Sequence, residues 1–191
     1  MQIKEFKFLS WNENFIDEQF KNWSRCYEWG YVLHELNKMG ANPLTIHNTC
    51  CGPSEIHKKF HYSLNLCTNR IVYNSDSNIT SINKDFTNFH LYNILNKSLN
   101  KYDVVLCIST LEEISDKELN IKIAFQNLYD QVKDGGRLII TCDYPMIQPE
   151  LLESLVGEKI KDTSNRLTGM TSYYKQPEFK NLSIILLDIQ K

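Results

Sequence analysis

The sequence lacks the features that mark several large classes of protein. Its 21 basic and 23 acidic side chains leave a formal net charge of only -2. Without a basic excess, the chain does not have the charge pattern of a protein that holds duplex nucleic acid through phosphates. No signal-peptide-like stretch or apolar run of membrane-spanning length occurs, and the 6 cysteines form no Cys-x-x-Cys pair, which favours reduced thiols. We therefore expect a cytoplasmic protein that binds neither nucleic acid nor a membrane.

Glycine is also scarce, with 7 residues in 191, and no stretch rich in proline, glycine or serine divides the chain. Because linkers between domains usually have that composition, we expect a single domain over residues 1–191. An apolar fraction of 42% supports a hydrophobic core without disulfides or metal. Within this domain we expect an N-terminal helical cap over 1–42 and an α/β core over 43–191.

Short apolar segments alternate with amphipathic ones along most of the chain. The segment 44–49 is short, β-branched and bounded by proline and glycine, and 102–109 is almost continuously apolar, as a central parallel strand covered on both faces should be. The pattern predicts an α/β fold, a three-layer Rossmann-like sandwich with a mostly parallel seven-stranded sheet whose last strand is antiparallel. The other segments that read as strands are 70–75, 89–95, 137–142 and 182–189.

Helix signals lie between these segments. Ser115 and Glu118 form a capping box, which satisfies backbone N–H groups at a helix start. The helix that follows is expected to stop at Gly135-Gly136, where glycine adopts the left-handed conformation without a Cβ clash. Further helices are expected within 15–39 and at 54–60 and 149–156.

In such a sheet, ligands bind at the carboxyl ends of the strands, where the strand order reverses. The loop at 47–55 leads from the first core strand into a helix start, whose exposed N–H groups favour a carboxylate or phosphate. Gly52 is the single glycine of this loop, so the loop does not match the dinucleotide fingerprint. Asp76, after the second core strand, suits a carboxylate that accepts hydrogen bonds from a ribose. Both features match a ligand with a ribose and an amino-acid carboxylate but no phosphate.

Three motifs follow one another in the order of the strands. They are Asn48-Thr-Cys50-Cys-Gly52, Asp76, and the segment Tyr102-Asp-Val-Val-Leu-Cys-Ile-Ser-Thr-Leu-Glu112. Together they resemble the motifs of class I S-adenosylmethionine-dependent methyltransferases, over about residues 23–189. Asn93 is similar to the polar residue that this family places near the adenine, and Arg25-Cys-Tyr-Glu28-Trp is similar to an upstream helix that closes over the cofactor.

The resemblance implies that S-adenosylmethionine is the cofactor and that N-terminal helices pack over its cleft. It implies methyl transfer to a small-molecule or glycan acceptor. Glu112 and Asp143, near the ends of predicted strands, are the expected substrate contacts. The residues implied in cofactor binding are Arg25, Asn48, Cys50, Gly52, Asp76, Asn93 and Ser109.

Two residues depart from the family pattern. Asn48 stands where the family has aspartate, and Cys50 stands where it has its first glycine. The first change removes a charge beside the cofactor, and the second puts a side chain where a turn favours none. These departures favour an alternative, a methyltransferase-like binding or interaction protein without turnover. A nicotinamide-dependent oxidoreductase is a third hypothesis, but it predicts a glycine-rich phosphate turn that the sequence lacks.

The catalytic residues remain open at this point. A general base is needed only when the acceptor carries a proton that must leave, and the candidates near strand ends are Glu112, Glu113, Asp143, His47 and His90. The sequence does not rank them, nor does it define an oligomeric state.

Two further patterns could indicate a metal site or a cofactor lid, but we interpret both as ordinary features of the fold. His57 and His61 have a helical spacing that suits a metal, but no carboxylate or cysteine completes the set, so we expect no metal. Trp23, Tyr27 and Trp29 have the spacing of a cofactor lid, yet aromatic residues at helical spacing usually pack in a core, which is the interpretation we prefer.

Overall fold

The strands of the protein form one mixed sheet. The computed structural model describes residues 1–10, 24–39, 44–49, 70–74, 100–114, 117–169 and 182–191, and within these ranges six strands lie in the order β1-β6-β5-β4-β2-β3. The pairs from β3 to β5 are parallel, whereas β6 is antiparallel to both β5 and β1. The antiparallel last strand is thus confirmed. The strands are β1 (Gln2–Phe8), β2 (Leu44–Asn48), β3 (Arg70–Asn74), β4 (Tyr102–Ile108), β5 (Val132–Tyr144) and β6 (Ser183–Gln190).

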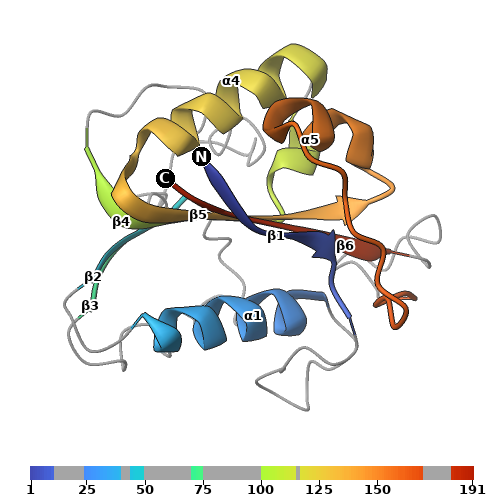
Figure 1. The fold of residues 1–191 in the computed structure, drawn as a ribbon, viewed down its shortest axis with the longest axis horizontal. Helices are drawn as coiled ribbons and strands as arrows, with labels where there is room; N and C mark the ends of the chain where they lie inside the picture. The colour runs from blue at the N-terminus through green and yellow to red at the C-terminus, as the bar shows by residue number, and fades with distance from the viewer. Residues whose placement is uncertain (11–23, 40–43, 50–69, 75–99, 115–116, 170–181) are drawn as a thin grey trace, which may run out of the picture.

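Helices cover both faces of the sheet. Helix α1 (Ser24–Lys38) lies on one face, and α4 (Lys117–Asp130) and α5 (Pro149–Val156) lie on the other (Figure 1). A short 3-10 helix, η2 (Leu111–Glu113), follows β4. This is the three-layer α/β sandwich that the sequence predicts. The strand expected at 89–95 and the helix expected at 54–60 lie outside the described residues. Among the described helices, none has the length and apolar character needed to cross a membrane.

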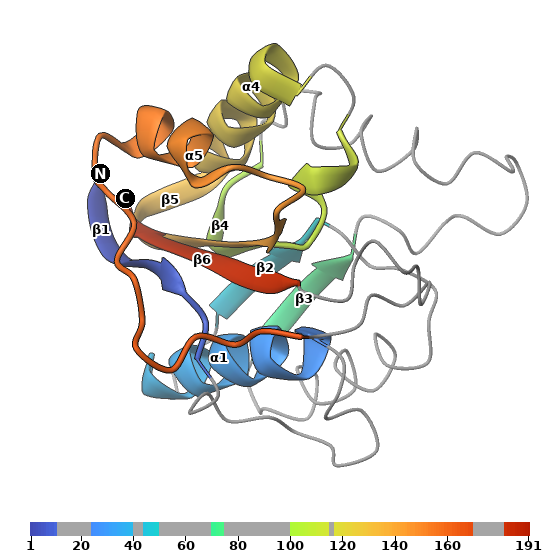
Figure 2. The same ribbon diagram turned by 90° about the vertical axis from the view of Figure 1, so that its right-hand side faces the viewer.

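The N-terminus differs from the expected helical cap. Gln2–Phe8 form β1, which pairs with β6 from Gln2 opposite Gln190 to Phe8 opposite Ile185. Phe6 and Phe8 are buried and alternate with the partly exposed Lys7, and this period of two fits a strand with one covered face. Because β1 covers the outer edge of β6, the two chain termini lie side by side (Figure 2).

The passage from α4 to β5 also differs from prediction. The helix ends at Asp130, earlier than the expected stop at Gly135-Gly136, because the buried Val132 already pairs with Tyr102 of β4. Both glycines therefore lie inside β5, where its pairing with β4 shifts register. Gly135 takes a φ of 79°, and a Cβ on Gly136 would lie 2.6 Å from the carbonyl oxygen of Asp103.

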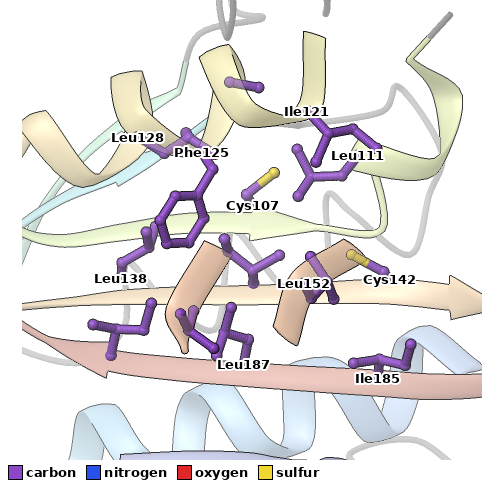
Figure 3. Close-up of a cluster of buried hydrophobic side chains, with 14 of the residues drawn as sticks. Cys107, Leu111, Ile121, Phe125, Leu128, Leu138, Cys142, Leu152, Ile185 and Leu187 are labelled. Carbon is purple, nitrogen blue, oxygen red and sulfur yellow. The ribbon is translucent and has the colours of Figure 1, made fainter. Parts of the chain in front are cut away.

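Two hydrophobic cores separate the layers. The first lies between the sheet and α4 and α5, and Figure 3 shows Phe125 of α4 above side chains from β4, β5 and β6. Its α4 contribution is a stripe at helical spacing, Ile121, Ala124, Phe125 and Leu128, as expected for an amphipathic helix. The second core lies under α1 and contains Tyr27 and Trp29. The core interpretation of these two aromatic residues is therefore confirmed, while Trp23 lies outside the described residues.

A buried polar network fixes the second half of α1 to the sheet. Tyr31 donates a hydrogen bond of 2.8 Å to Asp188 of β6. Arg137 of β5 binds both oxygens of Asp188 and also reaches Glu35 of α1 at 3.1 Å. Two side chains of α1 thus contact β5 and β6 through charge-assisted hydrogen bonds, which are stronger than neutral ones.

Candidate functional site

The strand order reverses between β2 and β4, because β2 pairs with β3 on one side and with β4 on the other. In open α/β sheets this position marks the ligand-binding crevice at the carboxyl ends of the strands. Asn48, the last residue of β2, is fully buried there. Thr49 donates two hydrogen bonds to the carbonyl oxygen of Leu106, from its backbone N–H at 3.0 Å and from its hydroxyl at 2.8 Å. The chain therefore leaves β2 along a fixed path beside β4.

The first turns of α1 bring a charged pair to the neighbouring strand ends. Arg25 Nη1 lies 2.7 Å from Glu28 Oε1. The other oxygen of Glu28 accepts hydrogen bonds from the hydroxyl of Ser109, at 2.6 Å, and from the hydroxyl of Thr141. Because Glu28 is completely buried, its carboxylate is stabilised by these donors rather than by water. One carboxylate of α1 thus joins the ends of β4 and β5.

Ser109, directly after β4, has an unusual backbone conformation. Its φ of 41° lies in the left-handed region, which is unfavourable for a residue with a Cβ. Its N–H donates to the carbonyl oxygen of Thr141 at 2.9 Å and to the Thr141 hydroxyl at 3.1 Å, and its hydroxyl also lies 3.3 Å from Asp143 Oδ1. The hydrogen bonds to β5 and α1 thus hold Ser109 in a strained conformation at this edge of the sheet.

Glu112 lies against Asp143 on the β5 side of this cluster. The backbone N–H of Asp143 donates to Glu112 Oε1 at 3.3 Å. The other oxygen, Oε2, is buried and accepts no hydrogen bond. Burial, together with the negative charges of Asp143 and Glu28, raises the pKa of Glu112 well above its usual range, although Arg25 opposes the shift. Glu112 is therefore a buried acid of raised pKa with one unpaired oxygen.

Arg25 is the cation that faces these carboxyl groups within the described part of the chain. Burial disfavours its charge, yet the negative charges of Glu28, Asp143 and Glu112 raise its pKa above the usual range. Its Nη2 donates to the carbonyl oxygen of Ser109 at 3.4 Å, and its Nη1 lies 3.9 Å from Asp143. Its buried Nε has no hydrogen-bond partner. We call Arg25, Glu28, Ser109, Glu112, Thr141 and Asp143 the edge cluster.

The structure brings four of the predicted site residues into the edge cluster, namely Arg25, Ser109, Glu112 and Asp143. Asn48 ends the adjacent strand β2. Sequence reasoning did not select Glu28 and Thr141 for the site, although Glu28 follows Arg25 by one helical turn within an otherwise apolar segment. Such a spacing signals an ion pair, and the apolar neighbours signal its burial. The other predicted site residues, Cys50, Gly52, Asp76 and Asn93, lie outside the described residues.

Of the histidines considered as candidates, the structure describes His47, which lies away from the edge cluster. His47 Nδ1 lies 2.6 Å from Gln131 Oε1, and its ring packs against Tyr102. Burial lowers its pKa despite that hydrogen bond. These neighbours lie at the start of β4 and just before β5, at the opposite end of the strands from the edge cluster. In the described ranges, no three His, Cys, Asp or Glu side chains are arranged to hold a metal ion; His57, His61 and His90 are outside them.

Comparison with solved structures identifies the fold. No protein family matches the chain, and no curated protein matches it. Across most of its length, however, the chain is structurally similar to class I S-adenosylmethionine-dependent methyltransferases. The N-methyltransferase NodS from Bradyrhizobium japonicum WM9, in complex with S-adenosylhomocysteine, matches 92% of this chain and 94% of its own, with a TM-score of 0.54 and 10% identity. The same protein without that ligand gives a TM-score of 0.53, also at 10% identity, over 92% of this chain and 99% of its own.

A third match is a TehB-like SAM-dependent methyltransferase from Corynebacterium glutamicum. It has 11% identity and a TM-score of 0.46, and the match covers 83% of this chain and 86% of the other. At identities this low the comparison establishes the fold alone, because one fold hosts many activities.

Proposed function

We propose that this protein is an S-adenosylmethionine-dependent methyltransferase that acts on a small-molecule or glycan acceptor. The observation that carries the proposal is the position of the edge cluster. Buried, charged and partly unpaired groups gather at the carboxyl ends of β4 and β5, beside the point where the strand order reverses. Ligands of α/β sheets bind at this point, and burial of polar groups without partners is otherwise unfavourable.

The unpaired atoms fit the charges of the proposed cofactor. S-adenosylmethionine has an amino-acid carboxylate, an ammonium group and a sulfonium. Arg25 offers a buried Nε donor without a hydrogen-bond partner, which suits the carboxylate. Asn48, at the end of β2, and Ser109, directly after β4, lie at neighbouring strand ends beside the point where the strand order reverses, and we assign both to cofactor binding. Asp76 is assigned to the ribose from the sequence pattern.

Methyl transfer from this cofactor needs mainly alignment, because the methyl donor is a sulfonium and leaves as a neutral thioether. Holding donor and acceptor in line lowers the entropic part of the barrier. The rigid edge suits this task, since hydrogen bonds to Glu28 and Thr141 fix Ser109. Glu112 and Asp143 lie on the β5 side, away from β2, and we assign them to the acceptor.

Calorimetric titration with S-adenosylmethionine, S-adenosylhomocysteine and NAD tests the proposal. We expect binding of the first two and none of NAD. Asp76→Asn should weaken S-adenosylhomocysteine binding by about 1 to 3 kcal/mol, the cost of a lost charged hydrogen bond. Asp134→Asn, at an exposed position in β5, is the matched control and should bind like the wild type. Absence of binding by both adenosyl compounds would refute the proposal.

Turnover is tested separately, with methyl-labelled S-adenosylmethionine and pools of small-molecule and saccharide acceptors. Transfer of label to an acceptor supports the enzyme. Tight binding of the cofactor without transfer to any pool supports the alternative, a methyltransferase-like binding protein, for which the replacement of the family's aspartate by Asn48 is the specific reason.

A further inference from the structure

The charges of the edge cluster distinguish between classes of acceptor. Glu28, Glu112 and Asp143 contribute three carboxyl groups, and Arg25 is the cation that the described residues set against them. Glu28 is fully occupied by Arg25, Ser109 and Thr141. At Glu112 the negative charge of Asp143 has a larger effect than the positive charge of Arg25, so the surroundings of this side chain favour a further cation.

Glu112 provides a second, independent observation. Its side chain is 3% exposed, and its Oε2 is buried without a hydrogen-bond partner. A buried carboxyl oxygen without a partner is costly in the free protein, and the group that would satisfy it is a hydrogen-bond donor, best a positively charged one. The cluster has a route to solvent, because the side chains of Arg25 and Asp143 are still 15% and 10% exposed.

We propose that the acceptor is an amine bound as its ammonium ion, with Asp143 and Glu112 as its contacts and Glu112 as the group that removes its proton. This inference rests on the proposed methyltransferase function. It selects nitrogen over the hydroxyl groups of sugars or alcohols, because a neutral hydroxyl gains far less from two carboxyl groups than an ammonium ion does.

The proton balance of the reaction explains the need for Glu112. An ammonium nitrogen has no lone pair, so the ionised Glu112 carboxylate first takes one of its protons. The freed lone pair then forms the N–C bond to the methyl group while the S–C bond breaks, and the electron pair of that bond stays on sulfur. The product nitrogen leaves as the methylated ammonium, and Glu112 releases its proton to water. Burial assists this transfer, because a carboxyl group of raised pKa is a stronger base toward an ammonium ion.

Charged and titratable groups act on Glu112 from both elements packed against it. Arg25 and Glu28 face it from α1, and Asp143 and Cys142 face it from β5. Of these, Arg25 alone favours the ionised carboxylate. An ammonium ion beside Glu112 adds a second positive charge, so its binding should release a proton from Glu112.

The test uses matched probes that differ in one group, glucosamine against glucose and ethanolamine against ethylene glycol. Each probe is titrated calorimetrically into the protein saturated with S-adenosylhomocysteine, so that binding is measured without turnover. We expect each amine to bind roughly tenfold more tightly than its hydroxyl partner, the effect of a net charged hydrogen bond. Proton release on amine binding is measured by repeating the titration in buffers of different ionisation enthalpy.

Glu112→Gln removes the charge and keeps the volume. In this variant the preference for amines and the proton release should both disappear, the rate of methyl transfer to an amine should fall about a hundredfold, and S-adenosylhomocysteine affinity should stay unchanged. Glu118→Gln, on the exposed surface of α4, is the control and should behave like the wild type. Thermal unfolding of each variant shows that it is folded.

Each other outcome overturns the inference in a recognisable way. If S-adenosylhomocysteine binds but the amines have no advantage over the hydroxyl probes, the amine acceptor is wrong and the proposed function stands. If Glu112→Gln weakens S-adenosylhomocysteine binding, Glu112 belongs to the cofactor site and not to the acceptor site. If neither adenosyl compound binds the wild type, the proposed function fails and the inference fails with it.

Discussion

Glu28 offers the sharpest test of how α1 is held over the strand ends. Its carboxylate is completely buried and accepts hydrogen bonds from Arg25, Ser109 and Thr141. Glu28→Ala leaves two buried hydroxyls without this acceptor and removes the nearest counter-charge of Arg25. Breaking a buried ion pair from one side costs about 3 to 5 kcal/mol. We expect the lower part of that range, because Asp143 still lies 3.9 Å from Arg25.

A second glutamate supplies the matched comparison. Glu118 forms an ion pair of 3.0 Å with Lys122 within α4, but its side chain is 79% exposed. Exposed pairs contribute little because water screens them, so Glu118→Ala should change the free energy of unfolding by less than about 0.5 kcal/mol. Both changes remove a helical glutamate with a nearby basic partner. The difference between their effects on the free energy of unfolding therefore measures how much burial strengthens the interaction.

Urea unfolding followed by tryptophan fluorescence measures both variants. For a chain of this length, each kcal/mol corresponds to about 2 to 4 °C in melting temperature, so Glu28→Ala should melt roughly 10 °C below the wild type. Glu28→Gln, which keeps the volume and one acceptor oxygen, should lie between Glu28→Ala and the wild type. A cost for Glu28→Ala within about 1 kcal/mol of the cost for Glu118→Ala would refute the view that this carboxylate anchors α1.

Three further predictions concern protonation and backbone packing. Burial keeps the pKa of Glu112 above its usual 4.5, so the favourable effect of Glu112 on stability is present below about pH 4.5 and is lost as the pH rises through its pKa in the folded protein. Glu112→Gln should therefore raise the midpoint of urea unfolding at pH 8 but not at pH 4. An equal change at both pH values would contradict this sign. Burial and Asp188 raise the pKa of Tyr31 above its usual 10.0, so the free energy of unfolding should fall above about pH 10, where the tyrosine of the unfolded chain ionises. In an alkaline titration, Tyr31→Phe should make this decrease shallower. At pH 7 the same variant should lose about 1 kcal/mol of stability, because the hydrogen bond to Asp188 is lost. A Cβ on Gly136 would lie 2.6 Å from the Asp103 carbonyl oxygen, whereas Gly135 has open space around it and a positive φ. Gly136→Ala should lower the free energy of unfolding by roughly 2 to 3 kcal/mol through overpacking, and Gly135→Ala by about 1 kcal/mol through backbone strain. A larger loss for Gly135→Ala than for Gly136→Ala in chemical denaturation would contradict the close approach.

The sequence predicts the local elements well, because their signals are local. The apolar run of β4 and the helical stripe of α4 lie within single elements. Both elements appear, although α4 ends before its expected stop. The start of β5 was misplaced because Gly135-Gly136 suits a helix end as well as a register shift in a strand. What decides between the two is the pairing of Val132 with Tyr102, and no short window contains both residues.

The centre of the edge cluster was missed for the same physical reason. Glu28 receives its hydrogen bonds from residues 81 and 113 positions further along the chain. Spacing within α1 identifies Arg25 and Glu28 as a pair but does not identify what the pair contacts. The sequence did select Ser109, Glu112 and Asp143, because these lie at or near the carboxyl ends of strands that local patterns locate.

The two polar networks of α1 differ in whether all of their buried side-chain atoms have hydrogen-bond partners. In the network of Tyr31, Glu35, Arg137 and Asp188, no buried side-chain atom lacks a hydrogen-bond partner, whereas in the edge cluster Arg25 Nε and Glu112 Oε2 both do. The edge cluster also contains Ser109 in its strained conformation. If anchoring α1 were its only role, apolar side chains of similar volume would serve as well or better. Strain and unpaired groups that persist together are typical of binding sites, and here they lie at the edge where α/β sheets bind ligands.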